Sequence, residues 1–162
     1  MRSLLARLLG CLGGIAIWVS PAVAAQPGDD INSYPLADGL SKGYYGSVSP
    51  PGTSNFPYGS LYFTAPNGWS CGIAPNGGPI GCDAVPSTAP PGTNQTFADA
   101  SLPAEYRHSD APIFTRDVPV LPAGQRLQTI GASCAVDYQG AIHCKTEGNH
   151  GFVLSADAGV LW

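Results

Sequence analysis

Charged side chains are scarce in this chain. Only 11% of its 162 residues are charged, and 7 lysines and arginines face 11 aspartates and glutamates. So few cations give the chain no sequence-independent attraction to nucleic-acid phosphates or anionic lipids. The sequence also lacks a glycine-rich G-x-G-x-x-G fingerprint and a P-loop, so nothing in it favours nucleotide binding.

Long apolar stretches are missing as well, with one exception near the start. Residues 8–19 form an apolar run of about a dozen residues, too short to cross a bilayer of ~30 Å as a helix. Arg2 and Arg7 precede this run, and the small residues PAVAA at 21–25 follow it. The order is typical of a cleavable export signal, here residues 1–25. We therefore expect a secreted or cell-wall-associated protein with no integral membrane segment after signal cleavage.

Loss of the signal changes the charge and the cysteine count. Five basic residues then face eleven acidic ones, a net charge of −6. Roughly 137 residues remain, which suits a single domain. Four cysteines stay in the mature chain, and an even number in an exported protein predicts disulfide bonds. They are Cys71, Cys82, Cys134 and Cys144.

The fifth cysteine, Cys11, lies inside the signal. The run LLGC at 8–11 resembles the tetrapeptide that precedes a lipid-modified cysteine. Modification there would leave the most apolar part of the segment, residues 12–19, on the mature protein. We therefore favour Cys11 as an ordinary apolar residue of the signal.

Two hairpins predict how the four cysteines pair. Asn76-Gly77 is a strong hairpin turn, and a turn centred on it sets Cys71 opposite Cys82. A literal two-residue loop would make these cysteines a wide, hydrogen-bonded type of pair, so we expect a slightly different loop. A three-residue loop at 138–140, with Gly140 in the left-handed conformation, sets Cys134 opposite Cys144. Each bond closes a loop of about a dozen residues, worth roughly 3 kcal/mol.

Turn residues punctuate the whole chain. The 21 glycines and 16 prolines exclude a mainly helical protein. The short β-type segments between them predict an all-β fold, a small disulfide-braced antiparallel sheet or partial barrel built from hairpins. Residues 97–107 are ambiguous, and a helix there would make the fold α+β. The expected strands are residues 60–64, 69–73, 80–85, 113–115, 118–121, 127–136, 141–146, 151–154 and 160–162.

The chain divides into three segments. Residues 1–25 are the signal, residues 26–59 a leader rich in glycine, proline and tyrosine, and residues 60–162 the disulfide-stabilised β domain. The leader shows neither helical nor strand periodicity. We expect it to be extended, with aromatic side chains of the leader against the core: Tyr44, Tyr45, Phe56 and Tyr58.

No catalytic or metal site emerges from the residue types. The run GASCA at 131–135, with Ser133 at its centre, matches the first half of a nucleophile elbow, but it ends in alanine and Ser133 abuts a predicted half-cystine. His108, His143 and His150 lack the spacing of a zinc motif. We therefore expect no cofactor, no metal and no catalytic residue.

Two further patterns have an ordinary explanation that we favour. Several aromatics of the chain offer rings that could stack on sugars, but we favour packing in the core and in turns as their role. They are Tyr44, Tyr45, Tyr58, Tyr62 and Trp69. Asn94-Gln95-Thr96 is a glycosylation sequon, which short sequences often contain by chance.

Three short motifs are shared with a known group of proteins. They read FTAPNGWSC at 63–71, GAIHC at 140–144 and NHGFVLS at 149–155, and Cys82 follows the first one. In these motifs the chain resembles a family of small exported actinobacterial, mycobacterial-type proteins with a domain of unknown function. The resemblance covers roughly residues 60–162 and implies a small secreted or cell-surface β domain with local disulfides. It implies no reaction and no catalytic residue.

Taken together, these features favour a non-enzymatic binding module whose partner is a protein or a cell-envelope component. Two alternatives stay open. One is a small extracellular hydrolase that uses acidic residues with His108, His143 or His150. The other is an inhibitor of secreted hydrolases that presents the disulfide-braced loop at residues 74–79 as a rigid insert.

Overall fold

The computed structural model describes residues 31–37 and 59–162. The predicted signal, Cys11 and the leader residues Tyr44, Tyr45, Phe56 and Tyr58 lie outside the described residues. Within the described part, no helix is long and apolar enough to cross a membrane.

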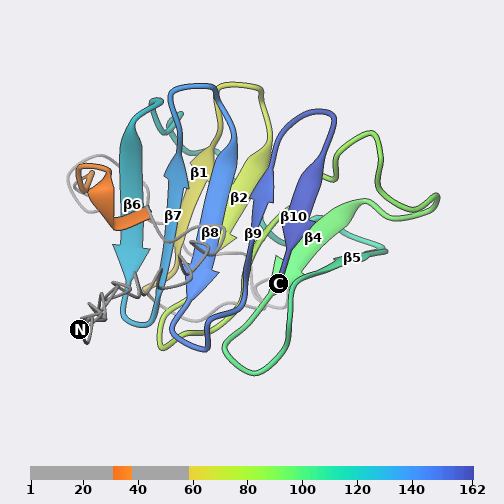
Figure 1. Ribbon diagram of the computed structural model, residues 1–162, viewed down its shortest axis with the longest axis horizontal. Helices are drawn as coiled ribbons and strands as arrows, with labels where there is room; N and C mark the ends of the chain where they lie inside the picture. Colours follow the sequence, from red (N-terminus) through yellow and green to blue (C-terminus); the bar gives the residue numbers. More distant parts are fainter. Residues whose placement is uncertain (1–30, 38–58) are drawn as a thin grey trace, which may run out of the picture.

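The described residues form an all-β fold of two antiparallel five-stranded sheets, which Figure 1 shows stacked on each other. One short 3-10 turn, η1 (Ile31–Ser33), precedes them. The first sheet has the order β1 (Leu61–Thr64), β2 (Ser70–Ile73), β3 (Ile80–Cys82), β4 (Gln95–Ala98) and β5 (Glu105–Arg107). The second has the order β10 (Gly159–Leu161), β9 (Gly151–Leu154), β8 (Ile142–Thr146), β7 (Ala132–Val136) and β6 (Gln125–Thr129).

The α+β alternative is wrong. Residues 97–107 contain the end of β4, a loop and β5, which pairs with β4. The Asp99 carboxylate accepts the backbone N–H groups of Ser101 and Leu102, as a helix cap does. Pro103 follows at once, and strand pairing of residues 105–107 replaces the helix.

Two other expectations need correction. Residues 113–115 and 118–121 are not strands, and only Val120 forms an isolated bridge, to Thr64. Residues 127–136 are two strands rather than one, because the chain turns at Ile130-Gly131 with Gly131 at φ 87°. A side chain on Gly131 would lie 2.4 Å from the backbone nitrogen of Gly77, so this tight turn requires glycine.

The disulfides are Cys71–Cys82 and Cys134–Cys144, the two pairs that the hairpin registers predict. Their Cα–Cα distances are 4.0 and 4.1 Å, which is the close, non-hydrogen-bonded type of pair. For Cys71–Cys82 this confirms the expectation that the loop differs from a literal two-residue one. The N–H of Ala74 donates to Pro79, so four residues form the loop and the alternation of the ladder shifts by one residue.

The core lies between the sheets. Strands β1, β2 and β3 contact β6, β7 and β8, respectively. Both disulfides belong to one buried cluster with the largest apolar side chains of the two inner faces. These include Phe63, Ile73, Ile80, Leu127, Ile142, Phe152 and Leu154.

The two sheets repeat one plan. Each is a five-stranded meander, and in each a disulfide joins the second strand to the third. The sequence carries the same marks, since Ser-Cys opens both hairpins at 70–71 and 133–134, and Ile-x-Cys closes them at 80–82 and 142–144. The sequence reading did not find this repeat.

A covering segment on each sheet repeats as well. We call residues 31–37 the N-terminal strap and residues 113–121 the central strap. The N-terminal strap forms a parallel bridge to β6, the first strand of the second sheet, and the central strap one to β1, the first strand of the first sheet. Both bridges have the same hydrogen bonds. The backbone N–H of one strand residue donates to the carbonyl of a strap proline, and the carbonyl of that strand residue accepts the N–H two residues after the proline. The bonds are Arg126 to Pro35 and Ala37 to Arg126, and Thr64 to Pro119 and Leu121 to Thr64.

Candidate functional site

The outer face of the second sheet carries a polar pocket beside the N-terminal strap. Ile31 of η1 is only 2% exposed, and η1 contacts β7 and β8. Figure 1 shows η1, in orange, next to β6. The pocket has a volume of about 220 Å³ and opens to solvent. Its described lining consists of Ile31, Asn32, Gln128, Gly131, Ala132, Ser133, Lys145, Thr146 and Glu147.

Strand geometry explains why these side chains meet. Ser133 and Lys145 face each other across β7 and β8, and Gln128 faces Ser133 across β6 and β7. Cys134 and Cys144 point into the core, so their neighbours Ser133 and Lys145 belong to the opposite, outer face. The disulfide therefore sits directly behind the pocket and fixes the two strands that form its floor.

Sequence reasoning placed Ser133 in an incomplete nucleophile motif. The structure places it on β7, 9% exposed, in the pocket floor rather than at a strand-to-helix turn. Asn32, Gln128, Lys145 and Glu147 were missed. The register that pairs Cys134 with Cys144 also pairs Ser133 with Lys145. The pairing of Ser133 with Lys145 could therefore have been predicted from the sequence.

His143 forms a mostly buried pair with Asp137 next to this face. His143 Nε2 lies 3.0 Å from Asp137 Oδ2, and the two side chains are 12% and 13% exposed. The ring of Tyr34, from the N-terminal strap, lies 6.4 Å from the His143 ring, centre to centre. Nδ1 of His143 is buried without a hydrogen-bond partner.

Asp137 also organises the turn between β7 and β8. Its Oδ1 accepts the backbone N–H groups of Gln139 and Ala141, each at 2.8 Å. Burial raises the pKa of this carboxyl, but the hydrogen bonds from His143, Ala141 and Gln139 outweigh burial and hold the pKa below its ordinary value. The carboxylate is therefore ionised at neutral pH and ties the turn to β8.

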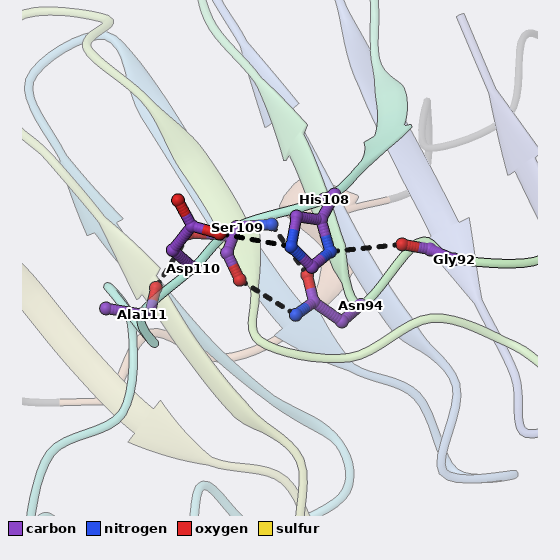
Figure 2. Close-up of polar contacts among 6 residues, drawn as sticks. All are labelled: Gly92, Asn94, His108, Ser109, Asp110 and Ala111. Carbon is purple, nitrogen blue, oxygen red and sulfur yellow. Dashed lines mark hydrogen bonds and ion pairs between the residues drawn. The ribbon is translucent and has the colours of Figure 1, made fainter.

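His108 belongs to a separate, exposed cluster, which Figure 2 shows. Its Nδ1 lies 3.1 Å from the carbonyl oxygen of Gly92, and its Nε2 lies 3.2 Å from Asp110 Oδ1. Asn94 donates to the carbonyl of Ser109 and accepts from the N–H of Ser109. The His108 side chain is 64% exposed, so this cluster joins two loops at the surface and lines no pocket that the structure describes.

The remaining candidates have structural roles. The backbone carbonyl of His150 accepts from the N–H and hydroxyl of Thr146 in the turn after β8. Tyr62 is buried and Trp69 packs against the core, in agreement with the packing interpretation of these two aromatics. Thr96 of the sequon is buried in β4 and donates to Ala84.

The loop at residues 74–79 packs against its own domain. Gly77 donates to the carbonyl of Ile130, and Ala100 donates to the carbonyl of Gly77. Only Asn76 of this loop is exposed. Most of this loop is therefore covered by its own domain.

Histidine, cysteine, aspartate and glutamate side chains in the described ranges form no group of three or more that could hold a metal ion. Comparison with protein-family models, with curated proteins and with solved structures finds no match.

Proposed function

We propose that this chain is a non-enzymatic binding module of the extracytoplasmic space. Its ligand is a neutral, hydroxyl-rich segment of a cell-envelope glycan, which binds in the pocket on the second sheet. The observation that carries the proposal is the lining of that pocket, which combines hydroxyl, amide, ammonium and carboxylate groups on a disulfide-fixed floor.

The chemistry of the lining selects the ligand class. Gln128, Ser133 and Asn32 supply both donors and acceptors, and an apolar ligand that covered them would displace water without replacing its hydrogen bonds. Lys145 and Glu147 have opposite charges, so neither a strongly anionic nor a strongly cationic ligand suits both. Sugar hydroxyls both donate and accept, and they match this mixture.

Binding is favoured over hydrolysis because the described lining contains none of the three histidines. It holds a single carboxylate, Glu147, whereas hydrolysis of a glycosidic bond generally uses two. A rigid floor with convergent polar groups is the arrangement that recognition requires.

The test is retention of the mature protein on isolated actinobacterial cell walls. Glu147→Ala removes one polar group of the pocket and should weaken retention about tenfold, the effect of losing one charge-assisted hydrogen bond. Glu105→Ala is the matched control, because Glu105 is also an exposed glutamate but lies on β5 of the other sheet.

Walls treated with a protease separate the two kinds of partner. A glycan ligand predicts that retention survives the treatment and remains sensitive to Glu147→Ala. Loss of retention on treated walls would identify a protein partner and contradict the glycan proposal. Equal loss for the Glu147 and Glu105 variants would show that the pocket is not the site.

A further inference from the structure

An exposed aromatic ring lies at one end of the sheet that carries the pocket. Tyr138 opens the three-residue loop between β7 and β8, and it is 74% exposed. Its ring lies 6.1 Å from the ring of Tyr34, centre to centre, and Tyr34 packs in turn beside His143. His143 alternates with buried residues along β8 and belongs to the outer face. The two tyrosines therefore form an aromatic pair on the outer side of the second sheet.

The chain around Tyr138 fixes its position. The Asp137 carboxylate accepts the backbone N–H groups of Gln139 and Ala141, which ties the loop to β8. The ring also rests on Gly124, where an added side chain would come within 2.5 Å of the Tyr138 ring. A ring that is exposed but already held in one place loses little conformational entropy when a ligand covers it.

The plan of the fold does not require an aromatic residue in this loop. The equivalent hairpin of the first sheet closes between β2 and β3 with residues 74–79, and their sequence, APNGGP, contains no aromatic residue. That hairpin carries a disulfide at the same place as its counterpart. The exposed tyrosine is therefore a particular feature of the sheet that carries the pocket.

The aromatic pair lies within reach of a ligand that extends out of the pocket. Tyr138 follows Ser133 of the pocket floor by five residues, which is no more than about 17 Å at ~3.4 Å per residue. The N-terminal strap connects the two places. Asn32 lines the pocket, Ser33 is exposed, and Tyr34 carries the ring beside Tyr138. An extended ligand that follows these strap residues out of the pocket reaches the aromatic pair.

The chemistry of a sugar matches an exposed tyrosine ring. A sugar ring presents C–H groups on its faces and hydroxyl groups at its rim. The C–H groups pack on an aromatic face, and the phenolic hydroxyl of tyrosine stays available for hydrogen bonds at the rim. Tyrosine is also a common contact residue in binding sites because its ring buries a large area with few rotatable bonds.

We propose that Tyr138 and Tyr34 form an aromatic subsite on which a sugar ring stacks, so that the protein binds an extended glycan segment rather than a single sugar. One end of the segment lies in the pocket, and a later sugar of the same chain lies on Tyr138. The ligand class rests on the proposed binding function, whereas the subsite rests on the position and exposure of the tyrosines.

Binding of glycan fragments of different length tests the subsite. Neutral fragments are released from isolated actinobacterial cell walls, separated by size and titrated into the mature protein. The wild-type protein should bind long fragments about fivefold more tightly than short ones, because only long fragments reach both places. Tyr138→Leu keeps an apolar side chain without the ring and should lose this preference. Tyr138→Phe keeps the ring and should retain the preference within about twofold.

Two controls keep the result independent of folding. Urea unfolding verifies that both variants are as stable as the wild-type protein, as expected for an exposed position. In the wild-type protein, the NMR signals of the Tyr138 ring should shift when long fragments are added. Unmoved ring signals with long fragments bound, or equal affinity of the wild-type protein for long and short fragments, would overturn the subsite.

The pocket variant separates this proposal from the proposed function. If Glu147→Ala weakens binding and Tyr138→Leu does not, the pocket stands and the aromatic subsite is overturned. If Tyr138→Leu weakens binding and Glu147→Ala does not, the subsite stands and the pocket is overturned as the site. Failure of every fragment to bind the wild-type protein would contradict both proposals.

Discussion

Two glycines on the outer face of the first sheet decide where the central strap can lie. A side chain on Gly72 would come within 2.8 Å of Phe114 and 2.9 Å of Tyr62, and one on Gly81 within 2.4 Å of Phe114. The missing side chains therefore create the site that Phe114 fills. On the second sheet, Ala135 and His143 face each other at the equivalent position, and the ring of Tyr34 lies tilted beside that of His143, 6.4 Å away centre to centre.

This complementarity predicts non-additive substitutions. Gly72→Ala should destabilise the protein by about 1–3 kcal/mol because the added methyl overpacks the site. Phe114→Ala should cost about 3–5 kcal/mol because it empties a buried site. The double variant should be more stable than the sum by about 1 kcal/mol or more, since the methyl then occupies vacated space. Urea unfolding of the four proteins measures this coupling, and strict additivity would show that Phe114 does not rest on Gly72.

Asp137 gives a prediction for pH. Its pKa is lowered in the folded protein, so the carboxylate stabilises the fold above the unfolded pKa of about 3.9. That contribution is lost as the pH falls through the folded pKa. Asp137→Asn should therefore lower the free energy of unfolding by about 1–3 kcal/mol at pH 7 and by less at each step below pH ~4.

Chemical denaturation at several pH values measures this difference. Asp157→Asn is the control, because Asp157 is exposed in the turn between β9 and β10, and it should change stability little at any pH. A difference between wild type and Asp137→Asn that stays constant down to pH ~2 would contradict the role of the charge.

At the scale of elements, turns with typical turn residues were the features that the sequence predicted best. Gly140 adopts φ 87°, and Asp137 and Ala141 close the three-residue loop as predicted. The turn at Ile130-Gly131 was missed because isoleucine is not a turn residue and nothing in its polarity interrupts the run at 127–136. The straps were misread as strands, or not placed, because apolar residues such as Phe114 and Ile31 pack on glycines or strands that are distant in sequence. The pocket was missed for the same reason, since Asn32 comes to line the same pocket as Lys145 only because the N-terminal strap lies on the second sheet.

At the scale of the molecule, the repeated plan has a consequence for connectivity. Each strap precedes one five-stranded meander along the chain but covers the other sheet. The chain therefore has the same order twice: the N-terminal strap followed by β1, and the central strap followed by β6. A chain that started before the central strap would therefore keep the same alternation of straps and meanders.

A circular permutant tests this equivalence. New termini between Asp110 and Ala111 fall in an exposed stretch before the central strap, and a flexible linker of about ten residues joins Trp162 to Gln26. Because every strand pair and both straps stay intact, the permutant should fold with both disulfides and lose no more than about 2 kcal/mol of stability. Peptide mapping without reduction and urea unfolding measure these two results.

A second permutant is opened between Cys82 and Asp83. It breaks the anchor of the central strap, which is the Asp83 carboxylate that accepts the backbone N–H groups of residues 113–115, and it should be markedly less stable. Equal stability of the two permutants would contradict the view that the chain consists of two strap-and-meander units whose boundary lies before the central strap.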